Sequence, residues 1–432
     1  MQVVVIGTGF VGVVTSAVLA KFENKVIGLD IDQAKVDSLN QGQVPFHEPQ
    51  LQDLLKAELA KGNLSFTTSY ELAIPQADVI MVAVGTPSAP DGTADLTYVQ
   101  KACEALAVHI KPGAVVCIKS TVPPGSFKDF ENRIKALTNT PFALASLPEF
   151  LREGSAVNDT LHPDRVVIGC SDEAALETLK TLHAPLNAPL AIMKPESAQM
   201  GKYSANAYLA QRITFINQIA DLCEENGADV QEVIQAIGFD KRIGSHYWYP
   251  GLGYGGSCFP KDVKELAAYS RSVGQGDNLF NKIDELNENR IFTKLRDYKQ
   301  QIGGWSGKKV AVLGLSFKPN TDDLREAPST KAIPQLLHEG AEVIAYDPMA
   351  SQAWERQYGQ LAGLTLVSDM ASACAQAEVI ILLVEWPEIT EFDFTQLPVL
   401  PNEQKRWLID TRNQLNPSQF SGEMWEYISI GR

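Results

Sequence analysis

Residues 2–12 read QVVVIGTGFVG, and this stretch decides the fold of the first part of the chain. The run QVVVI is short, apolar and rich in Val, which predicts a buried strand. Gly7, Gly9 and Gly12 follow in the G-x-G-x-x-G spacing, and a helical period begins directly behind them. In this spacing the first glycine makes a tight turn, the second lets a pyrophosphate approach the backbone, and the third packs the helix on the strand. The stretch therefore predicts a dinucleotide-binding strand, turn and helix.

Asp30 strengthens this prediction because it ends the next apolar run, about 20 residues further on. A carboxylate there accepts hydrogen bonds from both ribose hydroxyls and repels a 2′-phosphate, so we expect NAD rather than NADP. Phe10 and Val11 belong to the same turn and are expected beside the cofactor. Lys35 either flanks the adenosine ribose or is an ordinary solvated lysine. The alternative for the whole group is a glycine-rich turn with an unrelated Asp at a strand end.

Two later loops are expected to line the same crevice because each follows a predicted strand. They read VGTP (84–87) and KSTVPPG (119–125). Ligands of open α/β sheets bind at the carboxyl ends of the strands, so Thr86 and Thr121 offer small hydroxyl groups near a nicotinamide. In the alternative, each Thr merely closes its own turn.

The alternation of strands and helices recurs in the C-terminal part of the chain. Apolar, β-branched runs separated by helical periods indicate parallel strands covered on both faces. We therefore expect two doubly wound, Rossmann-like α/β domains. The predicted strands lie in QVVVIGTG (2–9), KVIGLD (25–30), ADVIMVAVGTP (77–87), AVVCIKSTV (114–122), FALASLPEF (142–150), RVVIG (165–169), KKVAVLGLSF (308–317), AEVIAYDP (341–348) and AEVIILLVEWP (377–387).

The middle of the chain predicts long helices instead of strands. From Ser197 to Asn226 apolar residues recur at helical spacing, and Gly227 stands where a C-terminal cap is expected. Further helical periods cover 229–237, 261–273 and 278–300, and the glycine-rich GGWSG (303–307) marks a boundary. The predicted domains are a cofactor domain (1–196), a central helical domain (197–300) and a second α/β domain (301–432). The long helix carries a dimer interface or serves as a spacer within one chain.

Composition excludes several classes of function. The net charge is −15, which argues against nucleic-acid and anionic-membrane binding. The six cysteines are scattered and show no zinc spacing, so we expect no metal site and a reducing, cytoplasmic compartment. The N-terminal run lacks a basic leading region and is interrupted by glycines, so no signal peptide is predicted. No stretch is apolar for long enough to predict a membrane span.

The segment GYGGSCFPKD (253–262) resembles the active-site stretch of the nucleotide-sugar 6-dehydrogenases. The resemblance extends in order over essentially the whole chain and is closest to the branch that acts on UDP-glucose. Ser257 stands where relatives that act on N-acetylated sugars usually have His. GDP-mannose or another nucleotide sugar is the alternative substrate, and SHYWYPGLGY (245–254) is more aromatic than the family pattern. The other matching segments are GTGFVG (7–12), KSTVPPG (119–125), LPEFLREG (147–154), KYSANAYLAQRITFIN (202–217), RIG (242–244), FKPNTDDLREAPS (317–329) and DTRN (410–413).

The resemblance implies oxidation of a primary alcohol to a carboxylate with two NAD⁺. Cys258 would capture the intermediate aldehyde as a thiohemiacetal and then hold the acid as a thioester, because a thiolate is both a good nucleophile and an acyl leaving group. The family uses a Lys and an Asn at the positions of Lys202 and Asn206 to stabilise the oxyanion. Asp262, Glu149 and Thr121 would hold the hydrolytic water, with Glu149 as the base.

The resemblance also implies the remaining site residues and the partners. Glu153, Lys261 and Arg325 would contact the cofactor, and Lys261 would favour the thiolate of Cys258. The partners implied are the small-molecule substrate UDP-glucose and a second copy of the chain in a homodimer, with Arg242 reaching the neighbouring site. The substrate would contact Glu149, Phe150, Leu151, Lys202, Asn206, Arg242, Tyr247, Tyr249, Gly255, Phe317, Lys318 and Arg412.

Overall fold

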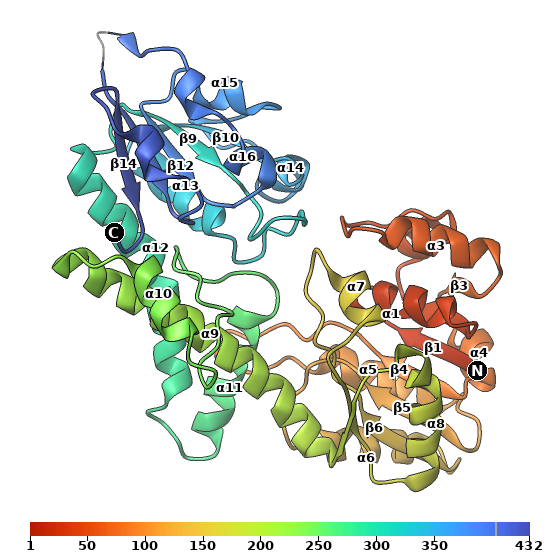
Figure 1. Ribbon diagram of the computed structural model, residues 1–432. Coiled ribbons are helices and arrows are strands. Elements are labelled where there is room, and N and C mark those ends of the chain that lie inside the picture. The colour runs from red at the N-terminus through yellow and green to blue at the C-terminus, as the bar shows by residue number, and fades with distance from the viewer. Residues whose placement is uncertain (402–403) are drawn as a thin grey trace. The chain divides into compact units, whose positions relative to one another are not determined.

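The computed structural model describes residues 1–401 and 404–432, which form two compact α/β units (Figure 1). The first unit comprises Met1–Ala205 and Glu265–Gln275, and the second comprises Asn206–Lys264 and Gly276–Arg432. Each unit contains its own parallel-dominated sheet, which confirms the predicted fold class. Within the described residues, no helix is both long and apolar enough to cross a membrane.

The sheet of the first unit has the order β3-β2-β1-β4-β5-β6-β7-β8. Strand β1 pairs in parallel with β2 on one side and β4 on the other, so the turn after β1 lies where the strand order reverses. Strand β7 joins β6 in antiparallel direction, which differs from the all-parallel prediction; β7 and β8 are parallel to each other. The strands are β1 (Gln2–Ile6), β2 (Lys25–Leu29), β3 (Leu64–Thr67), β4 (Val79–Val82), β5 (Ala114–Ile118), β6 (Phe142–Ser146), β7 (Val166–Gly169) and β8 (Leu190–Met193).

Both faces of this sheet are buried. Val3 and Val5 belong to a core on one face, and Val4 and Ile6 belong to a separate core on the other face. Side chains alternate between the faces of a strand, so a strand buried on both faces is apolar throughout, as the sequence predicts. The helices of this unit are α1 (Phe10–Lys21), α2 (Gln33–Asn40), α3 (Leu51–Ala60), α4 (Tyr70–Ala73), α5 (Thr97–Ala107), α6 (Phe127–Leu137), α7 (Ala156–Leu161) and α8 (Glu173–His183), with 3₁₀ turns η1 (Ile74–Gln76) and η2 (Ala184–Leu186).

The sheet of the second unit has the order β11-β10-β9-β12-β13-β14, and all its pairs are parallel. The strands are β9 (Lys309–Leu313), β10 (Glu342–Tyr346), β11 (Leu364–Leu366), β12 (Val379–Leu382), β13 (Arg406–Asp410) and β14 (Trp425–Ser429). The helices are α10 (Val230–Gly238), α12 (Leu279–Ile302), α13 (Pro328–His338), α14 (Ser351–Tyr358), α15 (Met370–Cys374) and α16 (Pro387–Thr390), with 3₁₀ turns η3 (Phe394–Gln396) and η5 (Pro417–Phe420).

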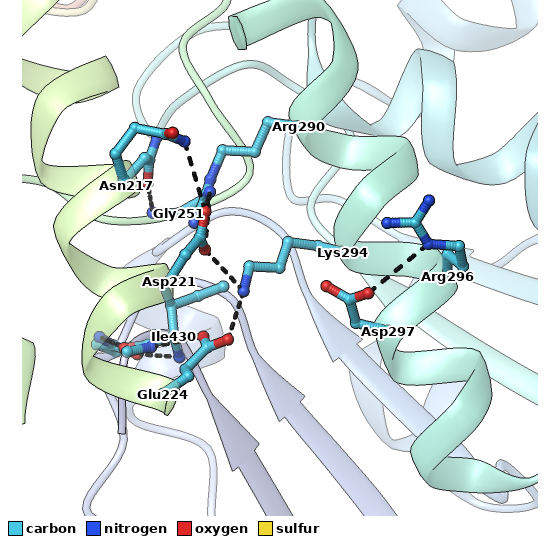
Figure 2. A network of polar contacts seen from close by, with 12 residues as sticks. Asn217, Asp221, Glu224, Gly251, Arg290, Lys294, Arg296, Asp297 and Ile430 are labelled. Atoms are coloured by element: carbon cyan, nitrogen blue, oxygen red, sulfur yellow. Dashed lines mark hydrogen bonds and ion pairs between the residues drawn. The ribbon is translucent and has the colours of Figure 1, made fainter. Parts of the chain in front are cut away.

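The predicted central helices are present. Helix α9 (Pro195–Asn226) ends directly before Gly227, and α12 ends before Gly303; both glycines have a positive φ. Helix α11 (Phe259–Ser272) follows the segment that contains the cysteine motif. The carboxyl part of α9 is joined to α12 by a network of charged groups (Figure 2).

The centre of this network is Asp221 on α9. It forms ion pairs with Arg290 (2.8 Å) and Lys294 (2.9 Å) of α12, and Lys294 also reaches Glu224 (2.6 Å). Arg290 donates through Nε to the carbonyl oxygen of Gly251, so the same network positions the aromatic loop 245–254 (Figure 2). Both cations are buried, and buried cations require partners of this kind.

Candidate functional site

The cofactor turn of the first unit joins β1 to α1 with the geometry that its glycines predict. Gly7 has a φ of 95°, a conformation that favours glycine. A Cβ on Gly12 would overlap the carbonyl oxygen of Gly7, so the close packing of α1 requires glycine at position 12. A Cβ on Gly9 would meet no other atom within 4 Å, so the backbone is open there. Phe10 and Val11 begin α1 and are half-buried.

Asp30 follows β2 and holds its carboxylate against this turn. Its Oδ2 accepts hydrogen bonds from the backbone N–H (2.9 Å) and hydroxyl (2.7 Å) of Thr8, and its Oδ1 accepts from the N–H of Asp32 (3.1 Å). Lys35 Nζ lies 3.2 Å from Oδ2. Burial raises the pKa of Asp30, but these hydrogen bonds and the lysine charge outweigh it, so the pKa is lowered. An ionised carboxylate beside an open glycine turn and a helix N-terminus fits the ribose and pyrophosphate of NAD.

The two threonines predicted to line the crevice are in contact. The hydroxyl of Thr86 donates to the carbonyl oxygen of Thr121 at 3.0 Å, which joins the loops after β4 and β5. This hydrogen bond places the hydroxyl of Thr86 next to the backbone of Thr121 and so connects the two loops.

Glu149 and Lys202 form an ion pair within the first unit. Lys202 Nζ lies 2.9 Å from Oε1 of Glu149, and the backbone N–H of Leu151 donates to Oε2 at 2.7 Å. Burial raises the pKa of Glu149, whereas Lys202, Lys119 and the hydrogen bonds lower it; the net direction is downward. Glu149 is therefore a partly buried carboxylate held in its charged, acceptor form.

Lys119 is a residue that the sequence did not single out beyond its motif. Burial lowers the pKa of Lys119; the charge of Glu149 opposes that shift and the charge of Lys202 adds to it, so the pKa is lowered overall. Only their convergence in space reveals this, because they come from segments after β5, after β6 and on α9. The signal in the sequence was the position of Lys119 directly after a predicted strand.

The loop after Glu149 contains the other predicted substrate residues of this unit. The guanidinium carbon of Arg165 lies 3.8 Å from the ring centroid of Phe150, and Lys202 Nζ lies 5.3 Å from the same centroid. Glu153 is buried, and Leu151 is half-buried. Stacked cations of this kind fix the orientation of an aromatic ring.

Cys258 lies in the second unit, directly before the first residue of α11. It is partly exposed, and its Sγ lies 3.5 Å from the hydroxyl of Ser257. Its carbonyl oxygen accepts the N–H of Asp262, which closes the first turn of the helix. The positive end of a helix favours an anionic sulfur at this position.

The other five cysteines are unsuited to nucleophilic chemistry. All five are buried, and burial raises the pKa of each thiol, to about 12 for Cys103 and Cys374. Buried cysteines of this kind pack as small apolar side chains. Among the six, Cys258 is the partly exposed thiol.

Asp262 is buried between the predicted catalytic residue Asn206 and the predicted cofactor residue Lys261. Its Oδ2 accepts from Nδ2 of Asn206 at 2.5 Å, and its Oδ1 lies 2.7 Å from Nζ of Lys261. Asn206 and Lys202 are one turn apart on α9, as their spacing predicts. The second unit thus brings Asn206, Lys261 and Asp262 together near the start of the helix that follows Cys258.

The glycines before Cys258 pack against a distant segment of the same unit. A Cβ on Gly255 would overlap the carbonyl oxygen of Glu326, and the ring of Phe317 packs on Gly256. The N–H of Gly256 donates to the carbonyl oxygen of Arg325 at 2.9 Å. These glycines are therefore required by the contact with segment 317–327.

Arg412 and Lys318 flank a glutamate at the carboxyl edge of the second sheet. Arg412 donates from Nη2 to Glu385 at 2.7 Å and also from Nε. Burial raises the pKa of Glu385, but Arg412 and Lys318 lower it, so the carboxylate is ionised. Tyr249 interacts electrostatically with the Arg412 guanidinium. Sequence reasoning missed Glu385, because its segment was interpreted only as a strand end.

Four predicted residues make local contacts. Arg242 is exposed and pairs with Asp240 (2.6 Å), and Arg325 pairs with Asp323 (2.7 Å). Tyr247 has a φ of 64°, and its ring centroid lies 5.7 Å from that of Tyr249. Within the described ranges 1–401 and 404–432, no group of three or more His, Cys, Asp or Glu side chains is placed to hold a metal ion.

Three family models match the chain in order. Their descriptions are the NAD binding domain (residues 1–187), the central domain (196–289) and the UDP binding domain (311–417) of the UDP-glucose/GDP-mannose dehydrogenase family. Together they match well over half of the sequence. The expectation of an NAD cofactor and a nucleotide-sugar dehydrogenase is confirmed.

Full-length relatives agree with these matches. The chain is 39% identical over 433 residues to UDP-glucose 6-dehydrogenase TuaD of Bacillus subtilis (strain 168), covering 100% of this chain and 93% of that protein. It is 38% identical over 446 residues to a UDP-glucose 6-dehydrogenase of Pseudomonas aeruginosa, covering 100% and 98%. The solved structure of a UDP-glucose dehydrogenase from the archaeon Pyrobaculum islandicum matches with a TM-score of 0.91 at 37% identity, covering 98% of each chain.

Proposed function

Because the chain belongs to the UDP-glucose/GDP-mannose dehydrogenase family, we propose that it oxidises the C6 alcohol of UDP-glucose to the carboxylate of UDP-glucuronate. Family membership makes it an NAD-dependent oxidoreductase. The names of the full-length relatives and of the matching structure support UDP-glucose as the substrate. One sugar, two NAD⁺ and one water would give one acid, two NADH and three protons.

The observation that supports a covalent mechanism most directly is the placement of Cys258. It is the partly exposed thiol among the six cysteines, and it lies at the N-terminal end of α11. NAD⁺, when bound, supplies the hydride acceptor for both oxidations. The residues of the chain bind the sugar, move protons and hold the half-oxidised carbon.

In the first stage the C6 alcohol loses a hydride and a proton and becomes an aldehyde. The sulfur of Cys258 adds to the aldehyde carbon, and the carbonyl oxygen becomes an alkoxide. Lys202 and Asn206 donate to that oxygen, since a buried ammonium and an amide on one helix face stabilise developing negative charge. Loss of a second hydride from the thiohemiacetal gives a thioester.

In the second stage water hydrolyses the thioester. Glu149 accepts a proton from water, the hydroxyl adds to the carbonyl carbon, and the carbon–sulfur bond breaks to release the carboxylate and the thiolate of Cys258. The lowered pKa of Glu149 supports this role, because an ionised carboxylate accepts the proton. Asp262 and Thr121 orient the water, and Asp262 is itself fixed by Asn206 and Lys261.

The anionic part of the substrate requires cations in the second unit. Lys318 and Arg412 lie near Glu385 and supply two positive charges at the carboxyl edge of that sheet. Arg412 is a planar donor suited to phosphate. Tyr247, Tyr249 and Phe317 provide the aromatic surface proposed for the base and sugar, and Gly255 packs beside Phe317.

The test offers UDP-glucose, GDP-mannose and UDP-N-acetylated sugars separately and follows NADH by absorbance. UDP-glucose should give two NADH per sugar consumed. A yield of one NADH, or turnover of GDP-mannose in preference to UDP-glucose, would contradict the proposal.

Replacement of the nucleophile tests the mechanism. Cys258→Ala should lower turnover about a thousandfold or more, because the aldehyde is no longer captured. Cys223→Ala is the matched control: it removes a buried thiol of the same unit and should leave turnover within about threefold of the wild-type rate. Acid formation by Cys258→Ala at the normal rate would disprove the assignment.

We also propose a homodimer built on α9. Tyr208 (55% exposed), Phe215 (51%) and Leu222 (60%) recur every seven residues and form an exposed apolar stripe. Phe239, after α10, is another exposed apolar residue of this unit. A second copy is the proposed occupant because Arg242, which in the family reaches the neighbouring site, follows Phe239 closely.

The oligomeric state decides this proposal. Phe215→Lys should convert a dimer into a monomer in light scattering coupled to gel filtration. Val108→Lys is the control, because Val108 is also exposed (61%) but lies at the end of α5 in the first unit. A wild-type monomer at micromolar concentration would refute the dimer.

Two broader proposals complete the assignment. The division into residues 1–196, 197–300 and 301–432 is supported by the three separate family matches. A cytoplasmic location is supported by the six cysteines, which are thiols rather than disulfides and suit a reducing compartment. Fractionation of the source cells should recover the enzyme with cytoplasmic markers.

A further inference from the structure

Glu48 is a buried glutamate that connects two distant segments of the first unit. It is 6% exposed, and each of its carboxylate oxygens accepts one backbone hydrogen bond. Oε2 accepts from the N–H of Gly154 and Oε1 from the N–H of Ala156, both at 2.7 Å. Hydrogen bonds from two backbone N–H groups to one buried carboxylate are strong and directional.

These two N–H groups end the loop that begins with Glu149. At its start the loop is fixed by Lys202, which pairs with Glu149, and by the N–H of Leu151, which donates to the same carboxylate. At its end Gly154 has a φ of 78°, and α7 begins at Ala156. The position of the Glu149 carboxylate therefore depends on restraints at both ends of one short loop.

Glu48 itself belongs to the segment between α2 and α3, which also contacts the cofactor turn. The ring of Phe46 lies 4.9 Å from that of Phe10, the first residue of α1. Close by, Gln50 adopts a φ of 67°, which is unusual for a residue other than glycine. One short segment thus touches both the dinucleotide turn and the loop that contains Glu149.

We propose that Glu48 is a positioning residue for thioester hydrolysis, through its hold on the 149–156 loop. The inference rests on the proposed function, in which Glu149 removes a proton from water while the carbon–sulfur bond to Cys258 breaks. No electron transfer occurs in this step. Glu48 touches neither substrate nor cofactor; it restrains the loop from which Glu149 projects.

The test is Glu48→Gln in the full-length enzyme with UDP-glucose and excess NAD⁺. An amide of the same shape keeps one acceptor oxygen but turns a donor toward the second N–H, so the loop end loses a restraint. The two oxidations should remain fast and release about two NADH per site, whereas the later steady rate should fall about tenfold to a hundredfold. After acid quench, intact-mass spectrometry should find more Cys258 as a thioester than in the wild type.

Glu58→Gln is the matched control. Glu58 is equally buried, at 1% exposed, and lies in the same unit, but it bonds to Lys61 and Asn63 at the end of α3. This variant should show the wild-type ratio of the fast and steady rates. A folded Glu48→Gln enzyme with that same ratio would overturn the inference.

A second variant decides the matter if Glu48→Gln does not fold. Glu48→Asp keeps the charge but is one methylene shorter, so it reaches at most one of the two N–H groups. Slowed hydrolysis in Glu48→Asp supports the inference, and a normal steady rate overturns it. Failure of the wild-type enzyme to reduce NAD⁺ with UDP-glucose would instead disprove the proposed function, which separates the two failures.

Discussion

In each of the two α/β units an aspartate follows the strand that pairs with the first strand of the sheet. Asp30 follows β2, and Asp347 follows β10. In both units the first strand is followed by a glycine with a positive φ, 95° at Gly7 and 97° at Gly314. Each aspartate accepts hydrogen bonds from the residues directly after its glycine. The two turns therefore have the same local design.

The two aspartates differ in what else their carboxylates bind. Asp347 accepts from six donors: Leu315 N, Ser316 N, Ser316 Oγ, Met349 N, Ala350 N and the indole of Trp386. Asp30 accepts from Thr8 and Asp32 and pairs with Lys35. In the first unit the helix begins at once, at Phe10, whereas in the second it begins only at Pro328.

This difference explains how one topology serves two purposes. A carboxylate near an open glycine and a helix N-terminus is suited to bind a ribose beside a pyrophosphate. A carboxylate surrounded by six protein donors stabilises its own loop, and a ligand would have to displace those donors at a cost of about 1–3 kcal/mol each. The position of an aspartate in the topology is therefore not sufficient to predict its function.

The largest effect is expected for Asp347→Ala. The variant should lower the free energy of unfolding by about 4 kcal/mol, because several buried donors lose their acceptor. Urea denaturation followed by tryptophan fluorescence measures this change. The affinity of the folded fraction for NAD should stay the same; a large loss of NAD affinity would remove the distinction between the two units.

Substitution of the glycines in the turn after β1 is expected to have the next largest effect on stability. Gly12→Ala should destabilise the protein by about 3 kcal/mol, because its Cβ would overlap a backbone oxygen. Gly9→Ala meets no protein atom and should leave the melting temperature within about 2 °C, yet weaken NAD binding, since a pyrophosphate approaches there. Thermal melts with and without NAD separate the two outcomes, and equal behaviour of both variants would contradict the open turn.

Asp30→Ala is expected to act mainly on binding. Loss of the carboxylate should raise the dissociation constant for NAD about tenfold to a hundredfold, the value of a charge-assisted hydrogen bond. The cost in stability should be smaller than that of Asp347→Ala, because fewer donors depend on Asp30. Isothermal titration with NAD tests the first statement, and unchanged affinity would be inconsistent with the proposed cofactor site.

The smallest effect concerns pH. Burial and repulsion from Glu288 and Glu326 raise the pKa of Asp284 in the second unit to about 6, although Lys264 and Lys331 oppose the shift. Because the pKa of Asp284 is higher in the folded state, its stabilising contribution is present below about pH 4 and is lost as the pH rises through 6. Asp284→Asn should add about 1 kcal/mol at pH 8 and nothing at pH 4.

Asp30 should titrate in the opposite sense. Its pKa is lowered in the folded state, so its contribution is present above about pH 4 and is lost as the pH falls further. Urea denaturation of Asp30→Asn and Asp284→Asn across pH 3–8 compares them directly. Parallel pH profiles for the two variants would contradict the assigned directions.

Most of the fold was accessible from the sequence because its strands are buried on both faces. Apolar runs, most of them rich in Val or Ile, located β1, β2, β4, β5, β6, β7, β9, β10 and β12. Sequence reasoning did not name β3, β8, β11, β13 and β14, which are short or contain polar residues, as in LTL (364–366) and RWLID (406–410). Their strand conformation depends on pairing with a neighbouring strand.

The sequence by itself determined the strand, turn and helix of the cofactor site. Glycine spacing acts within a few bonds, so a local pattern is sufficient to predict it. Tertiary structure alone decided that Lys119 lies near Glu149 and Lys202, and that Glu48 holds the 149–156 loop. It also decided that the carboxylate of Asp347 is surrounded by protein donors, whereas the carboxylate of Asp30 faces an open turn. The physical reason is that hydrogen bonds and charges act over a few ångströms in space, between residues separated by more than a hundred positions in the chain.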